Sequence, residues 1–159
     1  MMSSALTRAI CILGAILVLL TVNQSIRAKD RIIRTGERIY LALAPVDPRS
    51  LMQGDYMALR FQLAEQLDVP IAENRANLRA GIVLDAHDVA TLAQRGFSTD
   101  RFILYRVRNG QVWLGTNAYF FEEGSAKRFA DARFGEFRLD RESGEAVLVG
   151  LRDENLQAL

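Results

Sequence analysis

The sequence predicts a mainly β protein: a single antiparallel β barrel or sandwich with two or three short helices, preceded by an N-terminal transmembrane or signal-anchor helix. Three observations support this prediction. One uncharged apolar run lies near the N-terminus, short segments after it alternate apolar and polar residues, and turn-forming residues separate those segments. With 159 residues, of which 50% are hydrophobic, the chain has room for one domain with its own core.

The composition argues against several classes of function. The 20 Lys and Arg residues nearly balance the 19 Asp and Glu residues, so the clustered positive charge that nucleic-acid binding requires is missing. Cys11 is the only cysteine and His87 the only histidine, which excludes a disulfide framework and the usual Cys and His metal sites. We therefore expect no metal, no cofactor and no nucleic acid. We interpret His87 as a surface residue beside Asp85 and Asp88 at a strand end.

The apolar run is interpreted as a membrane anchor. A short tail, residues 1–8, precedes it, and residues 9–22 carry no charge. The run is shorter than the ~20 residues that usually cross a bilayer, and this length is typical of a signal peptide. Residues 23–28 match a cleavage site poorly, however. We therefore predict an uncleaved signal-anchor helix over residues 9–26, in contact with the lipid bilayer.

Residues 27–36 form a basic juxtamembrane linker that precedes the globular domain, residues 37–159. The linker is either a solvated spacer or a helical continuation of the anchor that ends at Gly36, and its basic side chains suit lipid head groups. The excess of Lys and Arg after the apolar run would by itself predict a cytoplasmic domain. A short N-terminal tail with an adjacent Arg commonly stays inside, so we favour an extracytoplasmic domain.

The first predicted strand, residues 37–44, alternates apolar and polar side chains and leads into a polar corner. In this corner Asp47 and Pro48 suit the start of a capped helical turn. Gly54 then offers a position that tolerates positive φ before the chain extends again. We interpret Pro48 and Gly54 as structural residues of the corner.

Residues 56–63 alternate again, which predicts a second strand. Its core-facing set is Met57, Leu59, Phe61 and Leu63. Tyr56 and Arg60 fall on the opposite face. If Tyr40 projects from the same face of a neighbouring strand, the two rings and Arg60 would form one exposed patch.

The rest of the domain is predicted to contain two hairpins, short strands and brief helical turns. The strongest signal is the Asn109-Gly110 pair between two extended segments, which is typical of a tight hairpin. In chain order we expect a loop at 68–78, a strand at 80–86, a helical turn at 89–94 capped by Asp88, the hairpin 101–108 with 111–116, a strand at 118–123, a helix at 126–132 capped by Ser125, the hairpin 135–140 with 145–151, and a terminal helical turn at 153–159.

The central corner also carries the family resemblance. Residues 54–61 read Gly54-Asp55-Tyr56-Met57-Ala58-Leu59-Arg60-Phe61, which resembles the Gly-Asp-Tyr-x-x-Leu-x-Tyr signature of the GDYXXLXY protein family of bacteria. The final Tyr of the signature is Phe61 here. Residues 45–51, the segment Gly135-Glu136-Phe137-Arg138 and the segment Gly150-Leu151-Arg152-Asp153-Glu154 also look like the pattern of that family, so the resemblance covers essentially the whole chain.

The resemblance implies a small tethered protein of the bacterial cell envelope that works with a multi-pass membrane protein. We therefore predict a non-enzymatic accessory or interaction protein in the bacterial inner membrane, with a periplasmic domain. The binding candidates are Asp47, Arg49, Asp55, Tyr56, Arg60, Glu136 and Arg138, and the structural residues of the motif are Pro48, Gly54, Leu59 and Phe61.

Two alternative functions stay open. Carboxylates near the 45–56 corner, with Glu136 and Asp140, could converge for acid–base hydrolysis of a sugar, although we favour turn caps and surface ion pairs as their role. Ser50 is the nearest candidate nucleophile, but it lacks a base. The third reading is a chaperone-like module that offers a sheet edge to an extended segment of another chain.

Overall fold

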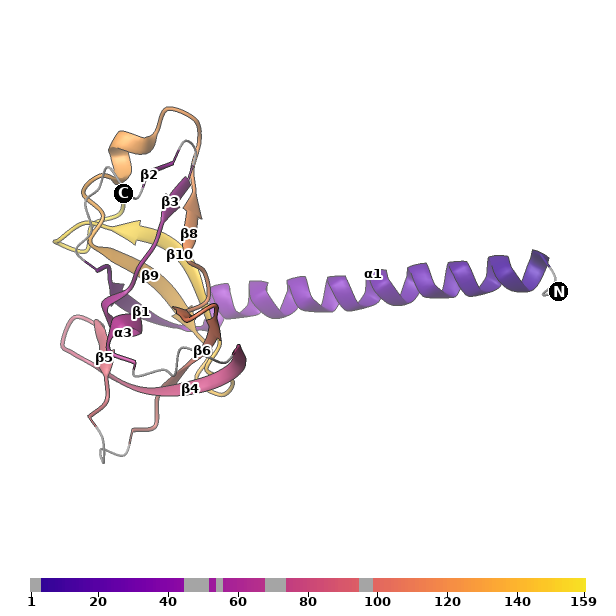
Figure 1. Cartoon of the computed structure of the whole chain (residues 1–159), viewed down its shortest axis with the longest axis horizontal. Helices are drawn as coiled ribbons and strands as arrows, with labels where there is room; N and C mark the ends of the chain where they lie inside the picture. Colours follow the sequence, from indigo (N-terminus) through magenta and orange to yellow (C-terminus); the bar gives the residue numbers. More distant parts are fainter. Residues whose placement is uncertain (1–3, 45–51, 54–55, 68–73, 95–98) are drawn as a thin grey trace.

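The computed structural model describes residues 4–44, 52–53, 56–67, 74–94 and 99–159. A long helix projects from one side of a β domain (Figure 1). The helix is α1 (Ser4–Thr35), and the strands of the domain are β1 (Glu37–Ala42), β2 (Met52–Gln53), β3 (Tyr56–Ala58), β4 (Arg75–Leu84), β5 (Ala90–Leu92), β6 (Phe102–Arg108), β7 (Gln111–Trp113), β8 (Ala118–Phe120), β9 (Phe134–Leu139) and β10 (Ala146–Arg152). Two short helices complete it, α3 (Gln62–Glu65) and the 3₁₀ helix η1 (Ala126–Phe129).

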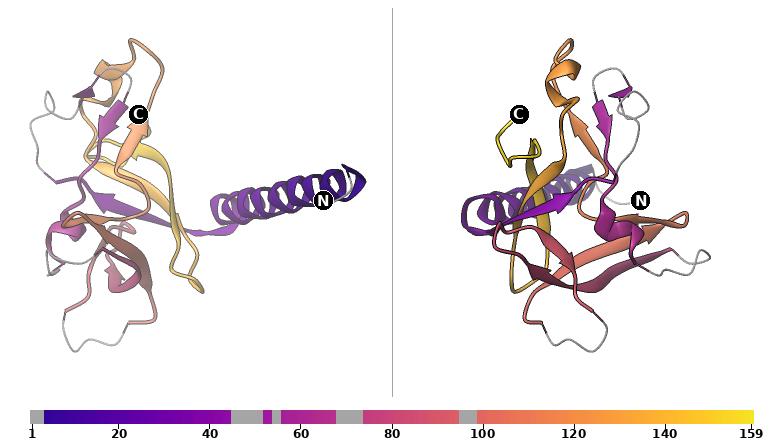
Figure 2. Two further views of the ribbon diagram at one scale, coloured as in Figure 1. Left: turned by 45° about the vertical axis from the view of Figure 1, so that its right-hand side comes forward. Right: turned by 90° about the vertical axis from the view of Figure 1, so that its left-hand side faces the viewer.

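The strands form three antiparallel sheets that curve around one core as a half-barrel (Figure 2). Their orders are β1-β9-β10, β2-β3-β8 and β5-β4-β6-β7. A parallel bridge between Tyr40 and Val89 joins the first sheet to the third, and a bridge between Leu43 and Phe61 joins the first to the segment after β3. The predicted mainly β class with an N-terminal apolar helix is thus confirmed.

The core lies between the sheets. Its largest fully buried side chains come from β1, β4, β6, β9, β10 and the segments after β3 and β7: Ile39, Leu41, Phe61, Ile82, Ile103, Leu114, Phe137, Leu139 and Leu151. The central strand β9 shows how the alternation of side chains decides which residues enter the core. Phe137 and Leu139 face the core, while Glu136 and Arg138, at the alternate positions, face the other side of the sheet.

Helix α1 continues through residues 27–35 and ends beside Gly36, whose N–H donates to the Ile32 carbonyl at 2.8 Å. Of the two alternatives for this segment, a solvated spacer or a continuation of the helix, the structure has the continuation of the helix. Ile32 is buried against the domain, and only Gly36 separates α1 from β1. The helix and the first strand are therefore joined without a spacer.

Both predicted hairpins are confirmed. β6 and β7 pair around Asn109 and Gly110, whose φ values of 50° and 73° match a primed turn. β9 and β10 pair around a loop in which Gly144 adopts φ 76°. A side chain at Gly144 would overlap the ring of Phe102, so this glycine is required by both conformation and space.

The second predicted strand is wrong in its latter half. β3 ends at Ala58, and residues 62–65 form helix α3. The expected apolar set, Met57, Leu59, Phe61 and Leu63, is nevertheless buried. After Phe61 bridges to Leu43, the Gln62 side chain donates to the Leu43 carbonyl at 3.1 Å, and one helical turn then buries Leu63. A short period-2 pattern cannot distinguish these two arrangements.

The predicted helical turn at 89–94 is also wrong, because residues 90–92 form strand β5. Asp88 has φ 63°, which an N-cap residue does not adopt. The Asp85 carboxylate instead accepts hydrogen bonds from the N–H groups of His87 and Val89, closing a tight turn that lets β5 pair with β4. Upstream, β4 begins at Arg75, within the segment predicted as a loop; residues 68–73 lie outside the described part.

Two further predictions concern short helices. The expected helix at 126–132 is the single 3₁₀ turn η1, and the Ser125 hydroxyl donates to the Glu122 carbonyl instead of capping η1. The expected C-terminal helical turn is wrong. The Asp153 carboxylate accepts hydrogen bonds from the N–H groups of Asn155 and Gln157, and this turn returns the chain so that Ala158 bridges to Arg152.

Candidate functional site

The motif residues 56–61 run from the edge of the domain into its core. Tyr56 in β3 pairs with Phe120 in β8, and the two ring centroids lie 5.7 Å apart. Phe120 is 75% exposed, so this end of the motif reaches the surface. The other predicted residues of the corner lie outside the described residues: Asp47, Pro48, Arg49, Gly54 and Asp55.

The C-terminal end of the motif packs against the segment 135–138. Leu59 and Phe61 are buried, and the Phe61 ring meets Phe137 edge to face at 5.3 Å. A Cβ atom at Gly135 would lie 3.0 Å from both rings, which is why a glycine suits this position. Two of the segments that carry the family resemblance are thus in contact through the core.

Arg60 lies apart from Glu136. Its exposed side chain lines a cavity of about 570 Å³, which is also bordered by Leu67, Val112 and Trp113. Glu136 is not among the residues that line this cavity. The structure therefore does not place the two candidate residues in one pocket.

Glu136 forms the buried charged centre of the sheet β1-β9-β10. Its carboxylate accepts a hydrogen bond from Arg152 Nε at 2.7 Å and a second one from the Nη2 atom of the same guanidinium. Arg138 Nη2 lies 3.5 Å from the other carboxylate oxygen. Glu136 is buried, whereas both arginines are partly exposed. We call these three residues the Glu136 cluster.

An irregularity in β10 places Arg152 on the same face as Glu136. Leu148 pairs with Phe137 on the core face, but the next pair joins Gly150 to Glu136, so one residue is added between them. Because successive side chains of a strand alternate between faces, this shift moves Arg152 from the core face to the outer face. Residues 135–138 and 150–154, which both resemble the family pattern, therefore meet in one ion pair.

Tyr40 lies opposite Glu136 in the register of β1 and β9. It is buried, so the exposed patch of Tyr40, Tyr56 and Arg60 expected from the sequence is wrong. The Arg38 guanidinium lies 5.7 Å from the Tyr40 ring centroid and pairs with Asp88 at 3.4 Å. These contacts extend the polar face of the sheet beyond the Glu136 cluster to the β4–β5 turn.

The Glu136 cluster suits binding better than acid–base chemistry. Its carboxylate accepts two hydrogen bonds from the Arg152 guanidinium and forms an ion pair with Arg138, so its oxygens are already engaged by cations of the same sheet. Arginine has five N–H donors, so the partly exposed side chains of Arg138 and Arg152 keep donors for an external acceptor. Sequence reasoning omitted Arg152 from the candidate residues, although it lies in a segment that resembles the family pattern.

A second cluster lies where α1 enters the domain, and sequence reasoning missed it. Glu37 accepts hydrogen bonds from Arg101 Nε and Nη2 at 3.0–3.2 Å, and these bonds raise the pKa of Arg101 above its usual range. Arg141 contacts Glu37 at 3.5 Å and Asp100 at 2.8 Å. We call these residues the Glu37 cluster.

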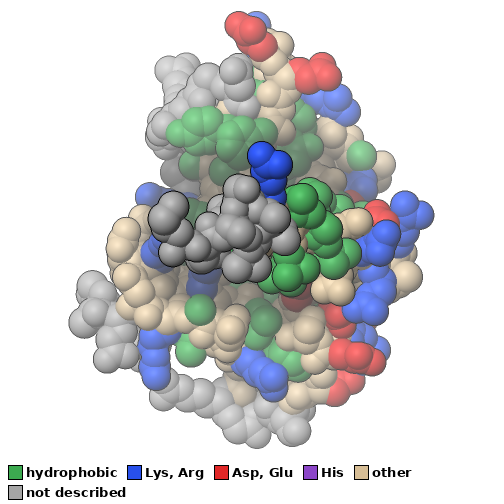
Figure 3. Space-filling model, turned by 90° about the vertical axis from the view of Figure 1, so that its right-hand side faces the viewer, with side chains coloured by type: hydrophobic (Ala, Val, Ile, Leu, Met, Phe, Trp, Pro, Cys, Tyr) green, Lys and Arg blue, Asp and Glu red, His purple; other side chains and the backbone are tan. Residues whose placement is uncertain are grey.

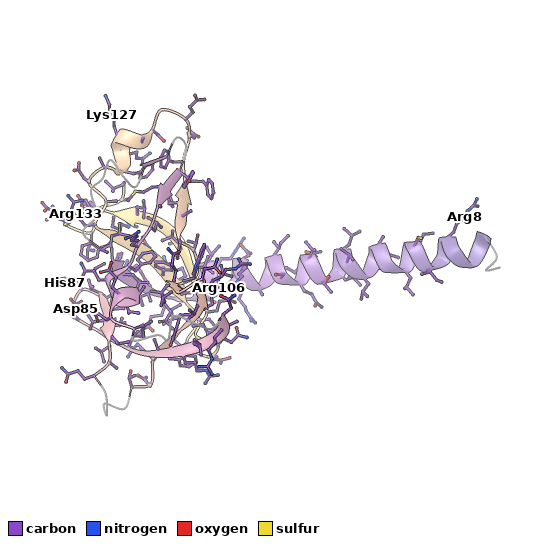
Figure 4. The ribbon with its side chains drawn as sticks, viewed as in Figure 1. Arg8, Asp85, His87, Arg106, Lys127 and Arg133 are labelled. Atoms are coloured by element: carbon purple, nitrogen blue, oxygen red, sulfur yellow. The ribbon has the colours of Figure 1, made fainter. Side chains whose placement is uncertain are left out.

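The only histidine lies in the β4–β5 turn, on the side of the domain away from α1 (Figure 4). His87 is exposed and neighbours Asp85, as predicted. Hydrogen bonds from the N–H groups of Val89 and His87 hold the pKa of Asp85 below its usual range. Among the described residues, no three His, Cys, Asp or Glu side chains are grouped so that they could hold a metal ion.

Comparison with known proteins identifies the family of this chain. The model of the family described as GDYXXLXY protein matches residues 18–151, which is most of the chain. Comparisons with curated proteins and with solved structures gave no match. The matched region includes the motif residues 56–61, the Glu136 cluster except for Arg152, and the second half of α1. The chain therefore belongs to the GDYXXLXY protein family.

Proposed function

We propose that this protein is a single-pass accessory or interaction protein of the bacterial inner membrane, with residues 9–26 in the bilayer and the β domain on the periplasmic side. Its domain binds a membrane partner, and a multi-pass membrane protein is the partner class that the family resemblance implies. The domain then acts by presenting a surface at a fixed distance from the membrane.

The exposure of α1 carries this proposal. One helix is long and apolar enough to span a membrane, and none of its most apolar window is buried against the domain. Leu13 and Leu17, for example, are 68% and 62% exposed. Such an apolar surface is unfavourable in water and is satisfied by lipid. The helix projects well away from the β domain (Figure 1), so a bilayer can surround it.

The partly exposed arginines of the Glu136 cluster supply the best-defined candidate contact for a partner. Arg152 is held by Glu136 in a fixed direction, and a pre-oriented guanidinium loses little freedom when it binds a carboxylate. A partner with an acidic segment would complement this face of the sheet.

The orientation is tested by labelling single cysteines in intact cells. In a Cys11→Ser background, Lys127→Cys places a thiol on an exposed part of η1, and Ser4→Cys places one at the start of α1. A maleimide that crosses the outer but not the inner membrane should label position 127 and leave position 4 unlabelled until the inner membrane is opened. The reverse pattern would place the domain in the cytoplasm and contradict the proposed orientation.

Anchoring and partner binding are tested on the same cells. The full chain should stay in the membrane fraction after an alkaline wash, and a soluble pool would contradict the anchor. After gentle solubilisation, the tagged chain should co-purify with a multi-pass protein. The variant Arg138→Gln should weaken this association while leaving the chain folded, and Arg108→Gln, on an exposed strand position outside the Glu136 cluster, serves as its control.

A further inference from the structure

A cavity of about 480 Å³ lies at the root of α1. Lys29 borders it from the helix, Arg106 and Trp113 border it from β6 and β7, and Glu145 borders it from the residue just before β10. Figure 4 shows Arg106 at the point where α1 meets the domain. We call this cavity the root pocket.

The charged side chains that line the root pocket are two cations, Lys29 and Arg106, and one carboxylate, Glu145. The Arg106 guanidinium lies 5.2 Å from the Trp113 ring centroid, and in the described part of the chain no carboxylate pairs with it. Within the same part, Trp113 Nε1 is a buried donor that has no hydrogen-bond partner. Buried donors normally have a partner. Trp113 lines both this pocket and the cavity beside Arg60, so its unused N–H is a donor at the border of the root pocket. Lys29 pairs with Glu145, and both side chains are partly exposed.

The position of the pocket along α1 indicates what that acceptor is. Lys29 follows residue 26, the end of the proposed anchor, by three residues, or about 4.5 Å along a helix. The head-group layer of a bilayer is roughly 5–7 Å thick on each side, so the pocket opens at its depth. Tryptophan and basic residues are enriched at this level. Viewed along α1, the domain shows Lys and Arg side chains on several sides of the helix (Figure 3).

We propose that the root pocket binds the phosphate group of an anionic phospholipid. Arg106 and Lys29 provide the positive charge, and the Trp113 indole N–H donates the hydrogen bond that the folded chain leaves unused. Glu145 opposes binding because it competes for Lys29. The depth of the pocket rests on the anchor proposed above, but the binding test below is done in micelles and does not depend on orientation or on the protein partner.

Trp113 is the only tryptophan, so its fluorescence reports on the pocket directly. The full chain in a neutral maltoside detergent is titrated with short-chain phosphatidylglycerol, with short-chain phosphatidylcholine and with inorganic phosphate. Lipid retention in native mass spectrometry is the second measurement, because substitutions beside Trp113 change its fluorescence by themselves. We expect a saturable response to phosphatidylglycerol alone.

Four variants sharpen the test. Arg106→Gln and Lys29→Gln should each weaken phosphatidylglycerol binding about tenfold or more, since each removes a charged hydrogen bond. Arg108→Gln is the matched control, because Arg108 lies two residues further along β6, is exposed and does not line the pocket. Glu145→Gln should tighten binding, a change that general damage to the fold would not produce.

The outcomes separate the possible ligands. A response to phosphatidylglycerol that Arg106→Gln weakens and Glu145→Gln strengthens supports the proposal. Equal responses to phosphatidylglycerol and phosphatidylcholine, or equal binding by Arg106→Gln and Arg108→Gln, would overturn it. Binding of inorganic phosphate as tight as that of phosphatidylglycerol would overturn the assignment to lipid. Thermal unfolding of each variant verifies that it is folded.

Discussion

Glu136 and Glu37 each pair with two arginines, yet the surroundings of the two carboxylates differ. The Glu136 side chain is 5% exposed in the middle of a sheet, whereas the Glu37 side chain is 23% exposed at the start of β1. Removing one partner of a buried ion pair leaves an uncompensated charge without water, while a more exposed charge regains hydration. The two clusters should therefore contribute differently to the free energy of unfolding.

The two clusters also connect different parts of the molecule. The Glu136 cluster joins β9 to its neighbour β10 and so fixes the register within one sheet. The Glu37 cluster joins the start of β1 to Arg101, just before β6, and to Arg141 in the β9–β10 loop. We infer that the first cluster holds the fold and that the second adjusts how the loops meet the root of α1.

The largest expected effect comes from breaking the Glu136 cluster. Arg152→Met should lower the free energy of unfolding by about 3–5 kcal/mol, because it leaves a buried carboxylate with only the longer contact to Arg138. Chemical unfolding of the full chain in detergent measures this loss. The double variant Glu136→Leu with Arg152→Met removes both charges and should recover much of it. A loss below about 1 kcal/mol in the single variant would show that the buried Glu136 cluster contributes no more to stability than an exposed ion pair does.

The next effect concerns the loop that carries Arg141. Gly144→Ala should cost at least about 2 kcal/mol, because it forces a side chain into the left-handed region and against Phe102. Gly150→Ala is the matched control, since an added Cβ there meets nothing within 4 Å. Thermal unfolding of the two variants should separate them clearly. Equal midpoints would show that the loop accommodates the added methyl group.

A smaller effect is expected in the Glu37 cluster. Glu37→Gln should lower the free energy of unfolding by about 1 kcal/mol, and the difference from the unsubstituted chain should shrink as salt is added. Substitutions in the Glu136 cluster should respond much less to salt, because buried pairs are screened less. Unfolding at low and high ionic strength tests this contrast directly. A salt-independent loss at Glu37 would show that its partial exposure does not govern its energetics.

The smallest effect concerns pH and the loop beside the Glu37 cluster. Hydrogen bonds from the Glu142 N–H and the Ser143 N–H hold the pKa of Asp140 below its usual value of 3.8. The ionised form therefore stabilises the fold above pH 3.8, and this contribution is lost as the pH falls through the lower folded-state pKa. Asp140→Asn should flatten the acid limb of the stability profile below about pH 4. If the variant loses stability below about pH 4 as the unsubstituted chain does, carboxylates other than Asp140 cause that loss.

Local sequence signals predicted the parts of the molecule that depend on neighbouring residues. The apolar run predicts the exposed helix, Asn109-Gly110 predicts a tight hairpin, and alternation predicts which side chains of residues 57–63 are buried. These signals are properties of chain stiffness and side-chain chemistry over a few residues. The same signals failed where a short pattern fits two conformations, as at α3 and β5.

The candidate site was only half predictable. Glu136 and Arg138 stand out in the sequence because they share a short segment, but their partner Arg152 is separated from them by the whole β9–β10 hairpin. By alternation alone, Arg152 shares a face with Leu148 and so points into the core. The extra residue between Leu148 and Gly150 reverses that expectation.

The sequence by itself thus determined that this chain has an apolar helix, a mainly β domain and two charged segments, residues 135–138 and 150–154. Only the tertiary structure decided that those segments form one buried ion pair, that α1 meets β1 without a spacer, and that Lys29, Arg106 and Trp113 share a pocket. The physical reason is that strand register and the packing of distant segments are set by side chains that meet across the fold, and one added residue in a strand changes which of them meet.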